Sequence, residues 1–275
     1  MISVLLALQL AQIEEGGIAK LITALSREAN AFTGCASKVF TEETLVHRIL
    51  KDDGKWKEFK VVSNYSFASP REKSTAVREI RLIQSVNGRG VKKSDSLDLI
   101  AMSVASGSDA DRRKMIEQLE KNGVRGVATD LGQLLLLFSE GSVGNYEFSF
   151  QGLRPAEDGA TNYLAFSFRQ IDGPEGMTVF RADKVEKPKL AGELWVGQED
   201  SRLFRVTLNS VISGDGAKVQ ETLQEMTVEY AWSDSLRCLL PSSAEHKEYV
   251  GNEVQVENKY RYKPYEAFGK ASKKK

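Results

Sequence analysis

The sequence predicts an α+β protein that is mainly β, in which long antiparallel strands form one curled sheet. Three observations lead to this prediction. Apolar and polar residues alternate in several runs, the runs at 37–50, 55–68 and 74–86 are long, and tight-turn pairs such as Asp53-Gly54 and Asn87-Gly88 end them. Typical strands have about 5 or 6 residues, so long strands with short turns favour a curled sheet or barrel over a sandwich of short strands.

The composition is that of an ordinary globular chain. Of its 275 residues, 41% are hydrophobic and 28% are charged, which is enough to bury a sizeable core. Lys plus Arg equals Asp plus Glu at 38 each, so the formal net charge is zero. A dedicated nucleic-acid binder would show a basic surplus, and we therefore expect no nucleic-acid partner.

The N-terminus begins with an apolar run from Ile2 to Ala11, followed by polar Gln12 and then Glu14. The run is too short to span a membrane, which takes about 20 residues. It is typical of the apolar region of a secretory signal with Ala11 at the cleavage position, although no Lys or Arg precedes it. The alternative is the first turns of a buried helix. We expect residues 1–12 to be a truncated export signal.

The segment after this apolar run has its apolar residues at helical spacing. Ile18, Leu21, Ile22, Leu25 and Ala29 repeat on one side of a 3.6-residue period, which predicts an amphipathic helix over 15–31. Its polar side is not rich in Lys, so the helix is expected to pack on the sheet and not on a membrane surface.

The first half of the chain then reads as strands interrupted by a short helical insert around 108–138. Ser108 with Asp111 is typical of a helix N-terminus. Thr129-Asp130 opens the segment LGQLLLLF at 131–138, which is consistent with a buried strand or a short buried helix. The Thr-Asp pair favours the helix.

The second half is almost entirely strand. The runs at 189–198 and 202–213 form one predicted hairpin, and those at 218–232 and 236–250 form another. A final strand ends at Tyr262. Because neither a flexible linker nor a repeat of fixed period appears, we expect a single domain over 13–268, followed by a basic tail at 269–275.

The two cysteines, Cys35 and Cys238, lie far apart and form no CxxC pair, and the only histidines are His47 and His246. A structural zinc site needs four clustered ligands, so none is expected. A disulfide would require export and Cα atoms within about 7 Å of each other. Two buried free thiols are the expectation.

Local phrases resemble a known family. They are Gly192-Glu193-Leu194-Trp195-Val196, the following turn and strand from Glu199 to Val206, the element Leu239-Leu240-Pro241-Ser242, and the stretch from Val61 to Leu97. Together with the order of elements, they resemble the LolA and LolB lipoprotein carriers and their outer-membrane lipoprotein-sorting-like relatives, specifically a poorly characterised bacterial member.

That resemblance implies an unclosed half β-barrel whose open side is plugged by helices, an apolar groove, and a periplasmic or envelope location. The carrier of this family binds the acyl chains of lipoproteins and uses an arginine inside its barrel to stabilise its lid. The sequence does not show which residue would correspond to that arginine.

Enzymatic motifs do not appear: there is no nucleophile elbow, phosphate loop, dinucleotide fingerprint or HExxH. The adjacent carboxylates Glu42-Glu43 and Asp52-Asp53 would face opposite sides of a strand, so neither pair is a general acid and base. His47 is expected to be a satisfied or exposed histidine. We therefore expect no enzyme, no metal and no cofactor. An enzyme would need clustered, perturbed carboxylates, or His47 beside His246.

Aromatic residues on the strands are the candidate ligand-binding residues. Such residues most often form plain core, but the concave face of a half-barrel is larger than two or three short helices can cover. We expect a monomeric, exported, non-enzymatic protein that binds a lipid, acyl chain or other apolar ligand. The alternative is an envelope module with a self-filled barrel, whose partner binds a strand edge. The candidates are Phe148, Phe150, Phe166, Phe168, Trp195, Phe204, Tyr230, Trp232, Tyr260 and Tyr262.

Overall fold

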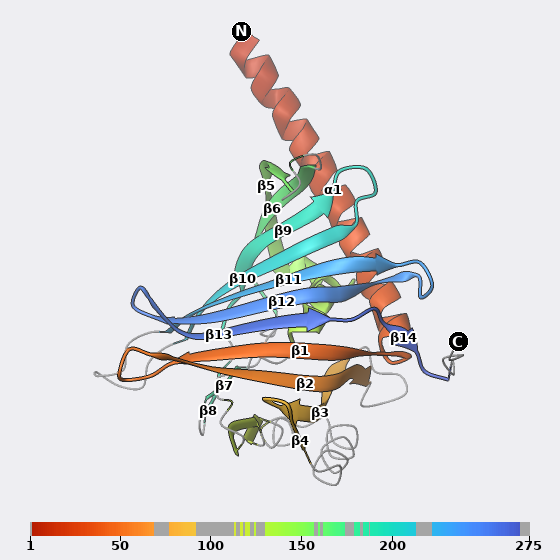
Figure 1. Ribbon diagram of the computed structural model, residues 1–275. Helices are drawn as coiled ribbons and strands as arrows, with labels where there is room; N and C mark the ends of the chain where they lie inside the picture. Colours follow the sequence, from red (N-terminus) through yellow and green to blue (C-terminus); the bar gives the residue numbers. More distant parts are fainter. Residues whose placement is uncertain are drawn as a thin grey trace.

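The computed structural model has one large antiparallel sheet of twelve strands with a long helix, α1, on its concave side (Figure 1). The structure describes residues 2–68, 77–91, 113, 116, 117, 119–121, 124, 130–156, 159, 162–173, 179–181, 184–186, 188–212 and 222–269. The strands of the large sheet are β1 (Val39–Leu50), β2 (Trp56–Ala68), β3 (Arg78–Val86), β4 (Arg89–Gly90), β5 (Tyr146–Pro155), β6 (Asn162–Gln170), β9 (Ala191–Gly197), β10 (Leu203–Ile212), β11 (Thr222–Ser233), β12 (Cys238–Val250), β13 (Glu253–Tyr262) and β14 (Glu266–Ala267).

The strand order is β4-β3-β2-β1-β13-β12-β11-β10-β9-β6-β5, and β14 pairs with β1. Each neighbouring pair is antiparallel, and β1 joins the two halves of the chain by pairing with β13, with Leu45 opposite Tyr260. Within the described residues the sheet is not closed, since β4 and β5 stand at opposite ends of the path. The predicted fold class, a mainly β, unclosed half-barrel, is confirmed. The separate hairpin of β7 (Val179–Arg181) and β8 (Lys184–Glu186) is not part of this sheet.

The predicted turns connect the strands as expected. Asn87 and Gly88 both have positive φ, at 50° and 75°, which is the backbone conformation of a tight hairpin turn. Gly54 (φ 76°) turns the chain between β1 and β2 in the same left-handed region. Buried and half-buried residues alternate along β1 and β11, so the period-two pattern of the sequence does set which side of each strand faces the core.

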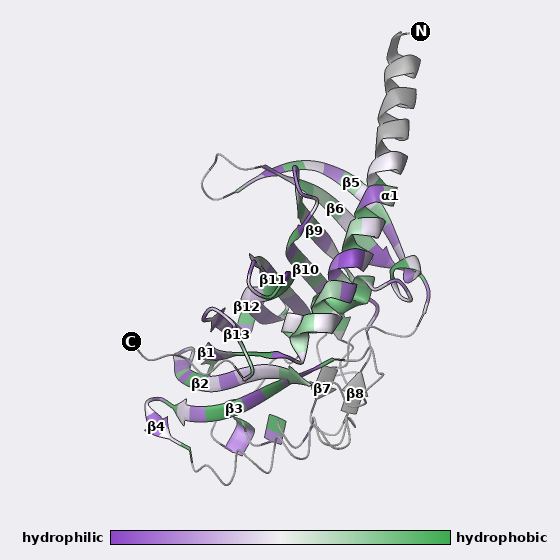
Figure 2. Ribbon diagram, turned by 90° about the vertical axis from the view of Figure 1, so that its right-hand side faces the viewer, coloured by the Kyte–Doolittle hydropathy of each residue, from purple (hydrophilic) through white to green (hydrophobic). Residues whose placement is uncertain are grey.

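The helix α1 (Ile2–Ala36) is longer than the predicted helix at 15–31. Its C-terminal half packs on the concave side through Leu21, Leu25, Ala29 and Phe32, all of which are buried. Figure 1 shows its N-terminal half running on beyond the sheet, and Figure 2 shows hydrophobic residues gathered where the other half meets the strands. Residues 2–12 continue the helix without a break, so their role as an export signal stays a prediction. Among the described residues, no helix is both long and apolar enough to cross a membrane.

The predicted insert ends in the 3₁₀ helix η1 (Leu131–Phe138), which lies between α1 and the sheet. The expected cap is not made: Asp130 adopts a left-handed conformation (φ 63°), and its side chain caps nothing. Before η1, most of the insert lies outside the described residues, although residues 113, 116, 117 and 119–121 are helical. A second 3₁₀ turn, η2 (Val143–Asn145), leads into β5.

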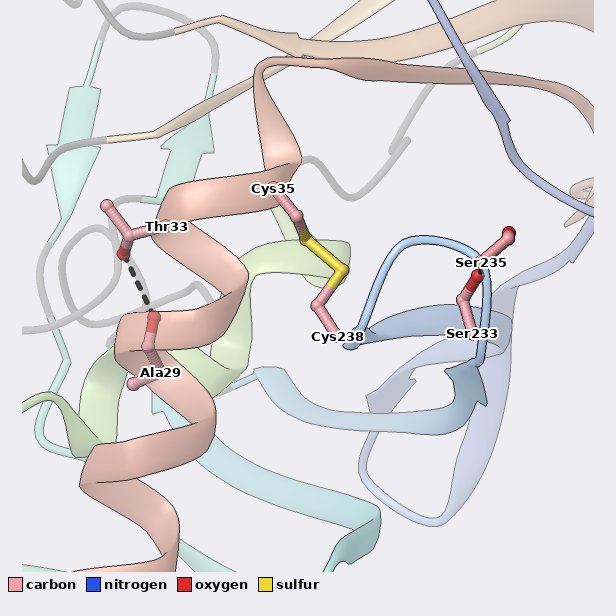
Figure 3. The surroundings of a disulfide bond; sticks show 6 residues. All are labelled: Ala29, Thr33, Cys35, Ser233, Ser235 and Cys238. Carbon is pink, nitrogen blue, oxygen red and sulfur yellow. Dashed lines mark hydrogen bonds between the residues drawn. A yellow bond between two sulfur atoms is a disulfide. The ribbon is translucent and has the colours of Figure 1, made fainter.

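The expectation of two free thiols is wrong, because Cys35 and Cys238 form a disulfide (Figure 3). Their Cα atoms are 6.6 Å apart although 203 residues separate them in sequence. The last turn of α1 and the first residue of β12 meet at this point, a contact that sequence spacing does not reveal. The bond therefore ties the helix to the middle of the sheet.

We expect that replacing both cysteines by serine lowers the free energy of unfolding by about 2–5 kcal/mol, because the bond constrains a very long loop of the unfolded chain. Urea denaturation without reductant measures the change. Ser235→Ala, in the turn next to Cys238, is the matched control and should change stability by less than about 0.5 kcal/mol. Equal midpoints for the double variant and the wild type would contradict the role of the bond.

Candidate functional site

The concave face of the sheet is the candidate site, because it gathers most of the predicted aromatic residues. Phe166, Phe168, Tyr230 and Tyr260 are buried there. Phe148, Phe150, Trp232 and Tyr262 are partly buried and pack against the same core. Eight of the ten candidates therefore share one face; whether they contact a ligand stays a prediction.

Trp195 and Phe204 lie on the opposite, convex face. Leu194 and Val196 are buried on the concave side, so the alternation along β9 turns Trp195 outward. A register shift beside Leu203 places Phe204 outward as well, where its ring stacks on Tyr163 at 4.3 Å. These two residues consequently do not line the concave face.

A trough of about 700 Å³ also lies on the convex face, across β5, β6, β9 and β10. It is open to solvent, and eight of its twelve lining residues are polar or charged. The lining also includes the candidates Phe148 and Phe168, which pack with the core. Its lining residues are Glu147, Phe148, Ser149, Gln151, Ser167, Phe168, Arg169, Ala191, Gly192, Glu193, Thr207 and Asn209.

The helix η1 covers the concave face as an apolar plug. Its buried residues include Leu134, Leu135 and Phe138, and the ring of Phe138 packs edge-on against Phe168 at 5.2 Å. Of the four leucines that follow Gln133, three are buried in the half-barrel and Leu136 is partly buried. Because η1 packs on the concave face, the aromatic residues there are buried by the chain itself.

Few polar bonds hold η1 in place. The carboxylate of Glu79 accepts hydrogen bonds from the backbone N–H groups of Asp130 at 2.7 Å and Gly132 at 2.6 Å. The hydroxyl of Tyr230 accepts one from the N–H of Leu135 at 3.1 Å. We call this set of bonds the η1 clip. A Cβ at Gly132 would lie 2.3 Å from the Tyr65 hydroxyl, so only glycine allows this approach.

A buried charge cluster supports the clip. Arg81 lies between Glu43 and Glu79, donating from Nε to Glu43 at 2.8 Å and from Nη1 to Glu79 at 2.6 Å. All three side chains are at most 3% exposed. Burial raises the pKa of the Glu43 carboxyl, while Arg81 acts against that rise. Burial also opposes the charge of Arg81, but its two carboxylates outweigh this and hold its pKa above the usual range.

Sequence reasoning missed Arg81, whose side chain is buried between Glu43 and Glu79 inside the half-barrel. Glu79 and Arg81 occupy alternate positions of β3, on the same side as buried Ile83. Two charges of opposite sign at core positions of a strand were the available signal.

His47 and His246, both buried, face the two sides of one amide. The Nδ1–H of His47 donates to Asn258 Oδ1 at 2.8 Å, and Asn258 Nδ2 donates to His246 Nδ1 at 2.9 Å. Burial lowers the pKa of His47, and it lowers that of His246 to about 3, so both rings are neutral at neutral pH.

His47 therefore lies beside His246, which is the arrangement that an enzyme would need. In the described part of the chain, however, both rings are hydrogen-bonded to Asn258, and the carboxylate of Glu248 lies 3.8 Å from Nε2 of His246. The same part contains no group of three or more residues that could hold a metal ion.

Comparison with known proteins finds similarity in structure only. No family model matches the chain, and no curated protein matches it in sequence. A solved LolA superfamily protein from Nitrosomonas europaea is 10% identical, with 89% of this chain and 92% of that chain covered and a TM-score of 0.36. A solved domain from Vibrio parahaemolyticus, described as belonging to an outer membrane lipoprotein-sorting protein, is 7% identical, with coverages of 90% and 93% and a TM-score of 0.41. Both come from the group that the sequence resembles.

We expect Arg81→Met to lower the free energy of unfolding by about 3–5 kcal/mol, because it leaves two buried carboxylates without their cation. Arg205→Met removes an ion pair with Glu229 that is partly open to solvent, and should cost about 1 kcal/mol or less. Urea denaturation compares the two. An equal loss of unfolding free energy in both variants would show that the buried ion pairs of Arg81 contribute no more to stability than the partly exposed ion pair of Arg205.

The pH dependence of stability should include a contribution from His246. Its native pKa is about 3 against an ordinary value of 6.5, so the unfolded state binds more protons between these values. Stability must therefore fall as the pH is lowered through this window. Glu43, with its raised pKa, acts in the opposite direction.

We expect His246→Gln to reduce the slope of unfolding free energy against pH by about 1 kcal/mol per pH unit over this window. Lys247→Gln, the outward neighbour, is the control and should leave the slope unchanged. Parallel stability profiles for wild type and His246→Gln, measured by urea denaturation across the window, would disprove the assignment.

Proposed function

We propose that this chain is an exported, non-enzymatic binding protein that holds an acyl chain or another apolar ligand against its concave face. The ligand takes the place of η1. The observation that carries the proposal is the η1 clip, through which an apolar segment is held over the aromatic face by a small number of polar bonds.

The chemistry of η1 supports exchange with an acyl ligand. Leu134, Leu135 and Phe138 present to the sheet only apolar surface, which a lipid chain would also present. Burial of apolar surface does not depend on direction, so one apolar occupant can replace another at little cost. Phe148, Phe168 and Tyr230 would then contact the ligand in place of η1.

The geometry of η1 makes it an element that opens readily. An eight-residue 3₁₀ helix is unusual, because its hydrogen bonds are poorer than those of an α-helix and runs beyond three or four residues are uncommon. Asp130, a non-glycine residue with φ 63°, adds strain at its start, on the order of 1 kcal/mol. Segments of low local stability are those that move on binding.

The disulfide supports export. Such bonds persist in oxidising compartments and are rare in the reducing cytosol. Together with the apolar N-terminal run, Cys35–Cys238 fits a protein of the bacterial envelope or periplasm. The proposal further takes the protein as a monomer, without nucleic-acid partners.

An alternative function is an envelope interaction module whose half-barrel is filled permanently by its own side chains. The burial of Phe168, Tyr230 and Tyr260 by the chain itself favours it. A partner protein would then pair with the edge strand β5, which in the described residues has a neighbour on one side only.

We expect Tyr230→Phe to bind a fluorescent polyene fatty acid about fivefold more tightly than wild type. The variant leaves the Leu135 N–H without its acceptor, which costs the closed state about 1 kcal/mol and shifts the population toward the open state. Fluorescence titration measures the affinity. Tyr249→Phe, far along β12 from η1, is the matched control and should bind as wild type does.

The two functions give different results in this experiment. Weaker binding by Tyr230→Phe would mean that its hydroxyl serves the ligand and that η1 is not displaced. Absence of binding by both wild type and Tyr230→Phe would leave the interaction module as the better function.

A further inference from the structure

The concave face has a second, polar end, remote from η1. Two cross-strand rows form it. His47, Asn258 and His246 lie opposite one another on β1, β13 and β12, and Glu248, Gln224 and Ser210 do so on β12, β11 and β10. We call these six residues the inner polar patch. Alternation along the strands turns all of them toward the same side as the core residues Met226 and Leu208.

The hydrogen bonds within the patch do not use all of its acceptor atoms. Because His47 donates from Nδ1 to Asn258, its Nε2 carries a lone pair. Gln224 donates from Nε2 to Glu248 Oε1 at 2.8 Å, which leaves its own Oε1 as an acceptor. In the part of the chain that the structure describes, His47 Nε2, Gln224 Oε1 and Ser210 Oγ have no hydrogen-bond partner.

These three groups are deeply buried. His47 is 0% exposed, and Gln224 and Ser210 are each 3% exposed. Leaving one buried polar group without a partner is unfavourable. Gln224 and Ser210 lie opposite each other on neighbouring strands, and His47 lies three strands away on the same face, so we take the three to have a common function. Two of them can only accept, and the serine can do both, so the fitting partner is a group that donates hydrogen bonds.

Among the described residues, the charge of the patch disfavours an anionic partner. The only charged member of the patch is Glu248, and its carboxylate would repel a phosphate or a carboxylate. The basic neighbours Arg48 and Lys247 occupy the alternate, outward positions of β1 and β12 and carry their charge on the other face. Both histidines are neutral, since burial lowers the pKa of each.

We infer that the inner polar patch binds the hydroxyl-bearing, uncharged polar end of an amphipathic lipid. This inference rests on the proposed function, because the acyl part of the same ligand would lie where η1 lies. Tyr230, at η1, and Gln224, in the patch, are six residues apart along β11, which corresponds to about 20 Å. That span suits a long acyl chain with its head at one end.

The test compares two probes of equal chain length, a monoacylglycerol and the corresponding fatty acid, by displacement of the fluorescent polyene fatty acid. Wild type should bind the monoacylglycerol about tenfold more tightly. The double variant Ser210→Ala/Gln224→Met removes two acceptors, together with the donor to Glu248, at nearly constant volume. It should bind the monoacylglycerol about tenfold more weakly and the fatty acid as wild type does. Glu225→Met, the outward neighbour of Gln224, is the matched control.

The outcomes separate the two proposals. Suppose that the fatty acid binds, but the double variant binds both probes with the affinity of wild type. The patch then holds water alone and the inference is wrong, while the proposed function stands. If neither probe binds wild type or Tyr230→Phe, the proposed function fails and the inference fails with it. Circular dichroism checks the fold of the double variant, and Ser210→Ala alone repeats the comparison if the double variant is unfolded.

Discussion

The need to keep one face of a curved sheet out of water determines most of this structure. The long strands of the sheet present apolar residues on their concave side, and an unclosed sheet cannot cover that side by itself. The half of α1 from Leu21 onward and the leucine-rich η1 supply the cover. The disulfide Cys35–Cys238 fixes the helix to β12, so the cover and the sheet form one folded unit.

The two covering elements are attached in different ways. The helix α1 is held by a covalent bond and by close packing. The helix η1 is held by hydrogen bonds to Glu79, Tyr230 and Ser26 and by its own apolar side chains. Buried charge is expensive, and Arg81 with Glu43 makes the burial of Glu79 tolerable. The charge cluster therefore does not strengthen the core as a whole. It fixes one acceptor at the place where the backbone of η1 needs it.

The concave face accordingly has two chemically different ends. The end under η1 is aromatic and apolar, and the end around His47 and Gln224 carries buried acceptors. An amphipathic molecule has the same division along its length. A protein whose barrel was filled only for stability would gain nothing from acceptors that find no partner in the described part of its chain.

The sequence by itself determined the strands, their turns and the fold class, because alternation and tight-turn pairs such as Asn87-Gly88 are local signals. It also identified most of the concave aromatics, since a period of two assigns the side of a strand. Only the tertiary structure decided what meets across that face: the bond between Cys35 and Cys238, the clip on η1, and the row from His47 to His246. These contacts join residues that are far apart in the chain. Their positions depend on strand register and sheet curvature, which no local pattern encodes.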